Sequence, residues 1–333
     1  MRLVGLDVGH RNVNAFDGNQ DIVFSALALP VGSAPSHLSG AVAGQIITVD
    51  GEQFVAGLDP DSVPNWSPMY GDKFIQSKAW KALALRAISQ FTHERMALAV
   101  GLPSDLYEND ELVALVKRLL TDKHKVGGRT IEVSLVVVIE QPCGSARAFL
   151  ETEDGKRLAG SILCVADAGG GTFDARLVMN DQAFPDVGGS TRPCMNALCE
   201  SLVGRVAARI GANSVGAGRI EAAMRSKGML SHFGKEVDIS DIIKEGAQET
   251  ADRLAVWLDG LLQGSEAEGV LLTGGGADVL FEPLKNRIDN IVKMVDPMKA
   301  NARGFQKILS DIVASQAPTS PKVVPMDEAK RSG

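Results

Sequence analysis

The chain has few of the residues that mark disulfide-rich or zinc-binding proteins. Only four of its 333 residues are cysteine, and only 5% are aromatic. Cys143, Cys164, Cys194 and Cys199 lack the CxxC spacing of a zinc site, and an internal thiol in a strand or helix packs as a small hydrophobic side chain. We therefore expect all four thiols to be reduced and structural.

Runs of positive charge and long apolar runs are also missing. The 34 Lys and Arg residues are outnumbered by 41 Asp and Glu residues, which gives a net charge of −7. Because no Lys/Arg-rich run is present, direct DNA binding is not expected. The N-terminal segment MRLVGLDVGH has the features of neither a signal peptide nor an amphipathic membrane helix, and later apolar stretches are too short to span a bilayer. We expect a cytoplasmic protein without membrane attachment.

Apolar residues and glycine are plentiful. Hydrophobic residues make up 45% of the sequence and 35 residues are glycine, a composition typical of α/β proteins. The length favours two domains of similar size. We predict domains over residues 1–150 and 151–312, leaving open whether the last helix returns to the first domain. The final segment has three prolines and scattered charge, which predicts a flexible tail over residues 313–333.

A pattern of strand, glycine turn and strand occurs twice. The apolar run of residues 2–8 ends at Gly9, and a second short run covers residues 12–16. Farther along, an apolar run ends near Asp167, and another covers residues 173–179 after a glycine turn. Two copies about half a chain apart predict two similar lobes, each with a hairpin whose turn points toward a shared cleft.

Hydrophobic periodicity predicts further elements between and after these hairpins. Helical patterns cover residues 78–91, 110–120, 191–211 and 240–262. Buried strands are expected over residues 94–103 and 129–142 and from residue 269 onward. Strands alternating with helices favour an α/β fold.

The first glycine turn contains Asp7, Gly9 and Asn12. A carboxylate at a strand end can hold Mg²⁺ through water, and a glycine lets backbone N–H groups approach phosphate oxygens without a Cβ in the way. Taken alone, the same pattern is also that of an ordinary hairpin turn. Its significance depends on the second turn.

The second turn runs from Asp167 through Gly169, Gly170 and Gly171 to Thr172. Three successive glycines give more backbone freedom than a hairpin requires, and they are typical of a loop that surrounds a phosphate. Asp167 could hold the water ligands of Mg²⁺ or accept a proton from an attacking water, and Thr172 could donate to a phosphate oxygen. The alternative is a glycine-rich loop that only closes a strand pair.

A third glycine cluster, Gly274, Gly275 and Gly276, follows a predicted buried strand and precedes a helix-like segment. A backbone without Cβ atoms permits close approach of a flat base or a ribose. The alternative is the start of an ordinary helix.

Glu140 and Gln141 stand at the end of the strand predicted over residues 129–142, before Pro142. Either side chain could orient water for in-line attack on a γ-phosphate. The alternative for Glu140 is an exposed carboxylate at a strand end.

In combination, these four features resemble the superfamily of actin, DnaK-type chaperones and sugar kinases over residues 1–310. The resemblance implies an α/β fold of the two-lobed actin-like ATPase type, each lobe having a mixed β-sheet flanked by helices. ATP and Mg²⁺ would lie in the cleft between the lobes, with Asp7 and Asp167 holding Mg²⁺ through water. The nucleotide would contact Asp7, Gly9, Asn12, Asp167, Gly169, Gly170, Gly171 and Thr172 at its phosphates and Gly274, Gly275 and Gly276 at its adenosine. Glu140 would lie nearest the attacking water and, with Asp167, would be catalytic.

One segment narrows the resemblance to a branch of this superfamily. MKANARGFQKIL, with Ala300, Asn301, Gly304 and Phe305, is similar to the ANxxGF segment of the ParM/StbA plasmid-segregation proteins. That branch implies ATP-dependent filaments of identical subunits and a small DNA-binding adaptor at a centromere-like site. The stretch SVGAGRIEAAMRSKG resembles the part that closes over the sugar and base, where Glu221 would contact the ribose; alternatively, it is an exposed helix with one charged face.

The first turn departs from the ParM/StbA pattern at three positions. Small hydroxyl residues after the glycine and a lysine two residues beyond the asparagine are common in that branch, whereas this chain has His10, Arg11 and Asn14. Asn14 cannot supply the charge of the lysine, although Arg11 is a planar donor that could reach a phosphate. These departures bear on the rate of hydrolysis and leave both aspartates in place.

Other functions of the same fold remain as alternatives. A small-molecule kinase or phosphatase would need a pocket for its substrate and a base aimed at an acceptor hydroxyl. A chaperone ATPase would need a β-rich peptide-binding domain, and only a short polar segment follows residue 315. A cell-shape filament of the MreB kind is the nearest rival among filaments. The ANARGF segment favours a dynamic filament that segregates plasmid DNA.

Overall fold

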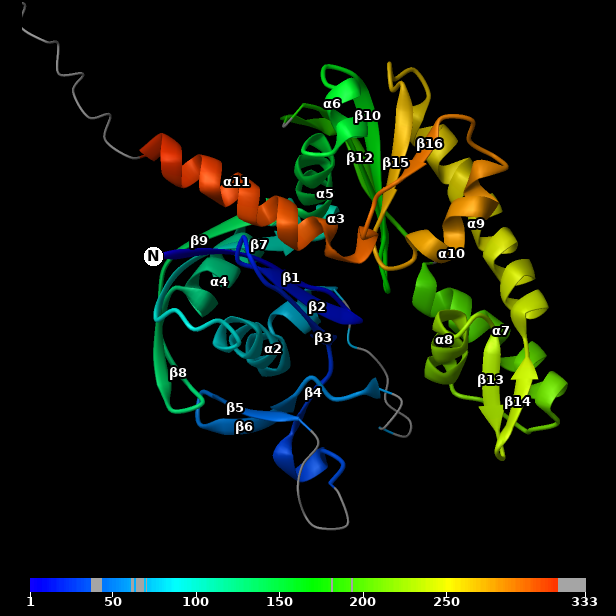
Figure 1. Cartoon of the computed structure of the whole chain (residues 1–333), viewed down its shortest axis with the longest axis horizontal. Coiled ribbons are helices and arrows are strands. Elements are labelled where there is room, and N and C mark those ends of the chain that lie inside the picture. The colour runs from blue at the N-terminus through cyan, green and yellow to red at the C-terminus, as the bar shows by residue number, and fades with distance from the viewer. Residues whose placement is uncertain are drawn as a thin grey trace, which may run out of the picture.

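Two mixed β-sheets with the same strand order lie at the centres of two lobes (Figure 1). The computed structural model describes residues 1–36, 44–60, 63, 69, 71–180, 182–192 and 194–316. The first sheet has the order β3-β2-β1-β7-β9-β8 and the second the order β12-β11-β10-β15-β16. In both, the first three strands pair antiparallel and the next two run parallel to the third. The duplication predicted from the glycine turns is therefore present in the fold.

The central strands are almost continuous apolar runs. Only strands with both faces covered have this pattern, and β1, β7, β10 and β15 are buried along most of their length. The strands of the first sheet are β1 (Arg2–Val8), β2 (Asn12–Phe16), β3 (Asp21–Ser25), β7 (Arg95–Leu102), β8 (Asp122–Val126) and β9 (Arg129–Glu140). Those of the second are β10 (Ile162–Ala168), β11 (Phe173–Met179), β12 (Gln182–Thr191), β15 (Gly269–Thr273) and β16 (Ile291–Lys293).

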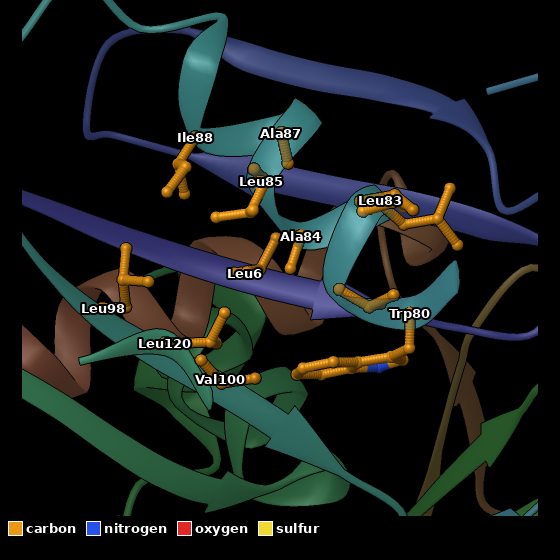
Figure 2. Close-up of a cluster of buried hydrophobic side chains, with 14 of the residues drawn as sticks. Leu6, Trp80, Leu83, Ala84, Leu85, Ala87, Ile88, Leu98, Val100 and Leu120 are labelled. Atoms are coloured by element: carbon orange, nitrogen blue, oxygen red, sulfur yellow. The ribbon is translucent and has the colours of Figure 1, made fainter. Parts of the chain in front are cut away.

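Helices α2 (Lys78–Ser89) and α4 (Asp110–Leu120) pack against the first sheet. Figure 2 shows Trp80 and other side chains of α2 beside Leu6 of β1 in the core of this lobe. The helix begins where the Ser77 hydroxyl accepts a hydrogen bond from the Trp80 N–H at 3.1 Å, which satisfies a backbone donor that has no partner within the helix. Local signals thus place the core side chains on the sheet.

The second sheet is covered by α7 (Met195–Ile210), α9 (Ser240–Leu262) and α10 (Ala277–Lys285). The α9 helix spans the predicted residues 240–262. The α7 helix starts later than the predicted residue 191, because β12 continues through Thr191 and hydrogen-bonds to β11 there. Residue 193 lies outside the described residues.

Smaller elements are inserted into each lobe. A three-stranded sheet of β4 (Ala28–Pro30), β5 (Gln45–Val49) and β6 (Glu52–Ala56) belongs to the first lobe. The second carries α8 (Ala217–Arg225) and the hairpin of β13 (Met229–His232) and β14 (Lys235–Asp238), at the end of that lobe farthest from α5 in Figure 1. Short helical turns are η1 (Val31–Ser33), α1 (Gly71–Ile75), α3 (Ser104–Tyr107), α6 (Glu153–Arg157) and η3 (Pro297–Lys299). Within the described part of the chain, no helix has the length and apolar character needed to span a membrane.

Two helices, α5 (Gln141–Leu150) and α11 (Ala300–Gln316), connect the lobes. The α5 helix follows the last parallel strand of the first sheet, yet its Phe149 packs in a cluster with residues of the second sheet. The α11 helix follows the last strand of the second sheet, and its Phe305 and Leu309 pack on β7 of the first. The first sheet is therefore covered in part by α11, which follows the second sheet in the sequence, and the second sheet is covered in part by α5, which follows the first.

The two helices cross at a contact between glycines. A Cβ on Gly304 would lie 1.7 Å from the carbonyl oxygen of Gly144, so neither backbone could approach this closely with a larger residue at 304. The ring of Phe305 fills the space beside Gly101 and Gly144. The ANxxGF resemblance thus corresponds to a packing requirement at the crossing.

The α11 helix also corrects one predicted boundary. It continues to Gln316, so residues 313–316, expected to begin the tail, are helical because Leu309 and its neighbours keep the helix packed on the first sheet. The rest of the predicted tail, residues 317–333, lies outside the described residues.

Candidate functional site

A cleft of about 470 Å³ between the lobes collects almost all of the predicted site residues. Its size is within the range of pockets that bind small molecules and cofactors. The predicted residues that line it are Asp7, Gly9, Asn12, Asp167, Gly169, Gly170, Gly171, Thr172, Glu221, Gly274, Gly275 and Gly276. Glu140 is the one predicted residue that does not.

The first turn (residues 7–14) and the second turn (residues 167–174) have matching backbone geometry. In the first, the Gly9 N–H donates to the Asn12 carbonyl at 3.0 Å, and in the second the Gly169 N–H donates to the Thr172 carbonyl at 2.9 Å. In both, the glycine is two residues after the aspartate. The two strand-end carboxylates are therefore presented in the same way from opposite lobes.

Both aspartates are buried in the cleft. Burial raises the pKa of Asp7 to about 6, against hydrogen bonds from Gln141 and Asn301 that lower it. Burial and, to a smaller extent, the nearby charge of Asp7 together raise the pKa of Asp167 to about 7, against a hydrogen bond from Asn301 that lowers it. Two buried carboxylates that disfavour each other's ionisation fit a site for a divalent cation, because the cation would offset this repulsion.

Each aspartate is oriented by an amide at the start of a connecting helix. The Gln141 Nε2 donates to Asp7 Oδ1 at 2.8 Å, and the Asn301 Nδ2 donates to Asp167 Oδ2 at 2.6 Å. The amides stand at equivalent places, since Gln141 precedes Gly144 and Asn301 precedes Gly304 by the same spacing. The duplication therefore includes the residues that hold the carboxylates.

Three helices begin at this cleft. Gln141 is the first residue of α5, Met195 the first of α7, and Gly276 the residue that precedes α10, and all three line the cleft. Free N–H groups and the helix dipole make such positions favourable for anions. The converging helix starts fit the phosphates of a nucleotide.

The third glycine cluster packs directly against the second turn. Gly274 has φ +85°, and a Cβ there would lie 2.2 Å from Oδ1 of Asp167. A Cβ on Gly276 would lie 2.5 Å from the Met195 side chain. Only glycine fits at position 274, both for its backbone conformation and for its distance from the carboxylate.

The far side of the cleft joins the first turn to α8. The Arg11 guanidinium pairs with the Glu221 carboxylate at 2.6 Å, and Arg225 pairs with the same carboxylate at 2.7 Å. The apolar side chains of Met224 and Val279 line the same region. An ion pair between lobes beside apolar surface fits a position next to a ribose and a base.

Two family models match the chain. One, described as actin-like proteins N-terminal domain, matches residues 5–144, and the other, described as archaeal actin homologue MreB-like, C-terminal, matches residues 165–286. The two matches include both turns and the third glycine cluster. The chain has an actin-like fold.

Solved structures of actin-like proteins share its fold. The archaeal actin homolog Ta0583 is 19% identical, with a TM-score of 0.78 over 94% of this chain and 100% of that one. Its complex with ADP is 18% identical, with a TM-score of 0.77 over 93% and 100%. A ParM filament from Clostridium botulinum is 14% identical, with a TM-score of 0.74 over 93% and 99%. None of the curated protein sequences matches this chain.

Glu140 is the predicted site residue that the structure places away from the cleft. Its carboxylate accepts a hydrogen bond from Arg176 Nε at 2.7 Å and lines a second cavity, of about 820 Å³. Adjacent side chains at a strand end point in different directions, so when Gln141 faces the cleft, Glu140 faces away. Gln141, the other residue considered at this position, is the one beside Asp7.

Asn301 and Asp174 are among the cleft residues that the sequence did not predict as site residues. Asn301 entered only through the ANxxGF resemblance, although its spacing to Gly304 repeats that of Gln141 to Gly144. Asp174 accepts a hydrogen bond from Thr172 Oγ1 at 2.6 Å and another from Ser190, and burial raises its pKa to about 7. Its position opposite Asp167 in the β10–β11 pairing was the available signal.

Proposed function

We propose that this protein binds ATP with Mg²⁺ in the cleft and hydrolyses ATP there. The observation that carries the proposal is the convergence of two matching turns, each with a buried aspartate, on a cleft where three helices begin. The archaeal homolog of the same fold, whose structure is described as a complex with ADP, supports a nucleotide as the ligand.

The residues of the cleft have distinct roles in this proposal. Gly170 and Gly171 would donate their backbone N–H groups to phosphate oxygens, and the absence of a Cβ at Gly9 and Gly169 would let the phosphates approach the turns. The Thr172 hydroxyl would turn from Asp174 to a phosphate oxygen, while Asp7 and Asp167 would hold Mg²⁺ through water. The bound cation would supply positive charge to the phosphate oxygens. Gly274, Gly275, Gly276 and Glu221 would contact the adenosine.

Hydrolysis requires a water held in line with the bond to be broken. Because Gln141 faces the cleft and Glu140 does not, we assign the orientation of this water to the Gln141 amide. The water oxygen would bond to the γ-phosphorus as the bond to the β–γ bridging oxygen breaks. Asp167 would accept the proton of the water, and ADP and phosphate would leave.

We further propose that the ATP-bound protein assembles head to tail into dynamic filaments in the cytoplasm. In the plasmid-segregation role, a small adaptor would link the filament to DNA. The similarity to structures described as ParM and as a ParM filament supports this proposal. Residues 1–150 and 151–312 would be its two domains, with α11 packed on the first.

An exposed aromatic side chain offers a place to test the assembly. Phe233 is 95% exposed at the tip of the β13–β14 hairpin, with φ +48°, a conformation that is unfavourable for a bulky residue. A subunit contact that covers this ring would account for its retention there.

Light scattering and pelleting with ATP and Mg²⁺, compared with ADP and with an Asp167→Asn variant, test both parts of the proposal. Scattering that rises with ATP and decays as phosphate is released supports a dynamic filament. Steady phosphate release without polymer at high concentration contradicts assembly, and absence of both contradicts the ATPase. Phe233→Ser should raise the concentration needed for assembly, whereas Val256→Ser, at an exposed apolar position on α9, should not.

A further inference from the structure

A buried ion pair joins the lobes at the second cavity and not at the cleft. Arg176 lies on β11 of the second lobe and is 3% exposed, while Glu140, the last residue of β9 in the first lobe, is 5% exposed. Both Nε and Nη2 of Arg176 lie 2.7 Å from Oε1 of Glu140. A charged pair buried this deeply needs close geometry to offset the loss of hydration.

The Arg176 side chain is held by more than its carboxylate partner. Its Nη1 donates to the Pro185 carbonyl at 2.6 Å, next to an irregularity in the pairing of β11 with β12. A Cβ on Gly188 would lie 2.7 Å from Arg176 Nε, so a glycine leaves room for the guanidinium. Arg176 is therefore fixed with respect to the second lobe, and its ion pair holds the Glu140 carboxylate in a fixed position relative to that lobe.

Glu140 is joined by one peptide bond to Gln141. It stands at the capping position of α5, yet its carboxylate accepts no capping hydrogen bond from the backbone of that helix; its contact there is with the Cys143 thiol, whose Sγ lies 4.0 Å from Oε2. The next side chain, Gln141, reaches the opposite way, to Asp7 in the cleft. A shift of the Glu140 backbone would therefore also move the backbone that carries the Gln141 side chain.

We propose that Arg176 is a positioning residue for ATP hydrolysis, which holds Glu140 so that the Gln141 amide stays at the place of the attacking water. The inference rests on the proposed ATPase. Because Arg176 and Glu140 belong to different lobes, the same pair makes the placement of Gln141 depend on the orientation of the lobes. A misplacement of about 1 Å can cost about a hundredfold in rate, so a rigid link of this kind matters for catalysis.

Removing one partner would strand a buried charge and destabilise the fold, so single variants cannot separate positioning from stability. The informative variant replaces both partners, Glu140→Met with Arg176→Met, because apolar side chains of similar length can fill the space without an unpaired charge. Two further variants are needed: Gln141→Ala alone, and Gln141→Ala combined with Glu140→Met and Arg176→Met. Arg205→Met with Glu249→Met, at an exposed ion pair of α7 and α9, is the control.

The measurements are the melting temperature, the affinity for a fluorescent ATP analogue and the single-turnover rate of phosphate release. We expect the Glu140/Arg176 double variant to fold and to bind the analogue like the wild type, and to hydrolyse ATP at least about tenfold more slowly. Adding Gln141→Ala should cause little further loss, because both changes act on the same amide. The control should hydrolyse ATP normally.

A wild-type rate in the double variant, or losses that multiply in the triple variant, would overturn the inference. If the double variant fails to fold, Arg176→Lys carries the test, since it keeps the charge but cannot hold Glu140 with two N–H groups. A wild-type rate in that variant would also overturn the inference. Failure of the ATPase itself would be seen separately, as a wild-type protein that binds the analogue and releases no phosphate.

Discussion

The two turns of this protein differ where their partner strands begin. In the first turn Asp7 pairs across the hairpin with Asn14, and in the second Asp167 pairs with Asp174. The shared parts, a buried aspartate, a glycine hydrogen bond and an amide from a helix start, are those that a cation and phosphates require. The extra carboxylate belongs to one lobe only, so under the proposed ATPase activity the second turn would carry more of the acid–base chemistry.

The turns also differ in what they contact. Both turns reach the other lobe, the first through the Arg11–Glu221 ion pair and the second through the Ser104 N–H, which donates to Asp174 Oδ1 at 3.3 Å. The second turn also packs against Gly274 of its own lobe. Movement of the lobes would therefore change contacts of both turns, while the contact with Gly274 would be kept.

Replacing Asp7 and Asp167 in turn is the strongest test of whether the second turn would carry more of the acid–base chemistry than the first. Asp7→Asn and Asp167→Asn should each lower the rate of phosphate release by about a hundredfold or more, with the larger loss at Asp167 because it would also accept the proton. Single-turnover assays over a range of Mg²⁺ concentrations measure this. Asp259→Asn, at an exposed position on α9, is the control. Full activity in the Asp167 variant would contradict the proposed role.

Gly274→Ala should damage the second turn selectively. An alanine at this position would have to adopt φ +85°, and its Cβ would lie 2.2 Å from Asp167 Oδ1. We therefore expect a loss of about 2 kcal/mol in the free energy of unfolding and weaker ATP binding. Urea denaturation and ATP titration measure the two effects. Gly275→Ala, where a Cβ would meet no atom within 4 Å, should unfold like the wild type and is the control for stability alone, because Gly275 is also proposed to contact the adenosine. Equal losses of stability at both positions would show that the close approach to Asp167 is unimportant.

Asp174→Asn removes a buried carboxyl group from the second turn, and Asn14→Asp adds one to the first. These two changes should move the pH dependence of stability from the second turn to the first. Burial raises the pKa of Asp174 from 3.8 to about 7, so the folded protein holds this proton more tightly than the unfolded chain. Its contribution to stability is full below pH 3.8 and is lost as the pH rises through about 7, at about 1.4 kcal/mol for each unit of pKa difference.

In the nucleotide-free protein, Asp174→Asn should therefore flatten the fall in melting temperature between about pH 4 and pH 7. Asn14→Asp should steepen it, because Asn14 is also buried. Thermal unfolding across this pH range gives both slopes. An unchanged slope in the Asp174 variant would mean that other groups dominate the dependence.

The smallest effect is expected at the link between the first turn and α8. Arg11→Ala should weaken ATP binding by about fivefold, because a partly exposed ion pair contributes about 1 kcal/mol. Affinity measured at low and high salt should show a smaller difference between variant and wild type at high salt. Arg225→Ala removes the pair within α8 and leaves the link between lobes, so it should bind ATP almost normally. If both variants bind equally weakly, the link has no special role.

Local patterns were enough to predict the lobes and most of the cleft. The pattern of strand, glycine and strand around Asp7 and Asp167 depends on the chemistry of neighbouring residues, and it appears in the structure as predicted. The α9 helix also matches its predicted range because its apolar spacing is regular over many turns.

The failures have a different physical origin. Whether Glu140 or Gln141 faces the cleft depends on the direction of the strand end and on Arg176 from the other lobe, which no local pattern contains. The β13–β14 hairpin was not predicted, since Lys235–Asp238 is short and mostly exposed and has little apolar alternation. Asp174 required knowledge of the strand pairing.

The exchange of α5 and α11 between the sheets has a consequence for synthesis on the ribosome. The apolar face that includes Ala97, Ala99 and Ile139 is translated before the second lobe, whereas Phe305 and Leu309, which cover it, are translated after that lobe. The first lobe therefore leaves the ribosome with an exposed apolar surface that stays uncovered until α11 has been made. A nascent chain arrested before α11 should bind chaperones through that face, and emergence of α11 should end the interaction.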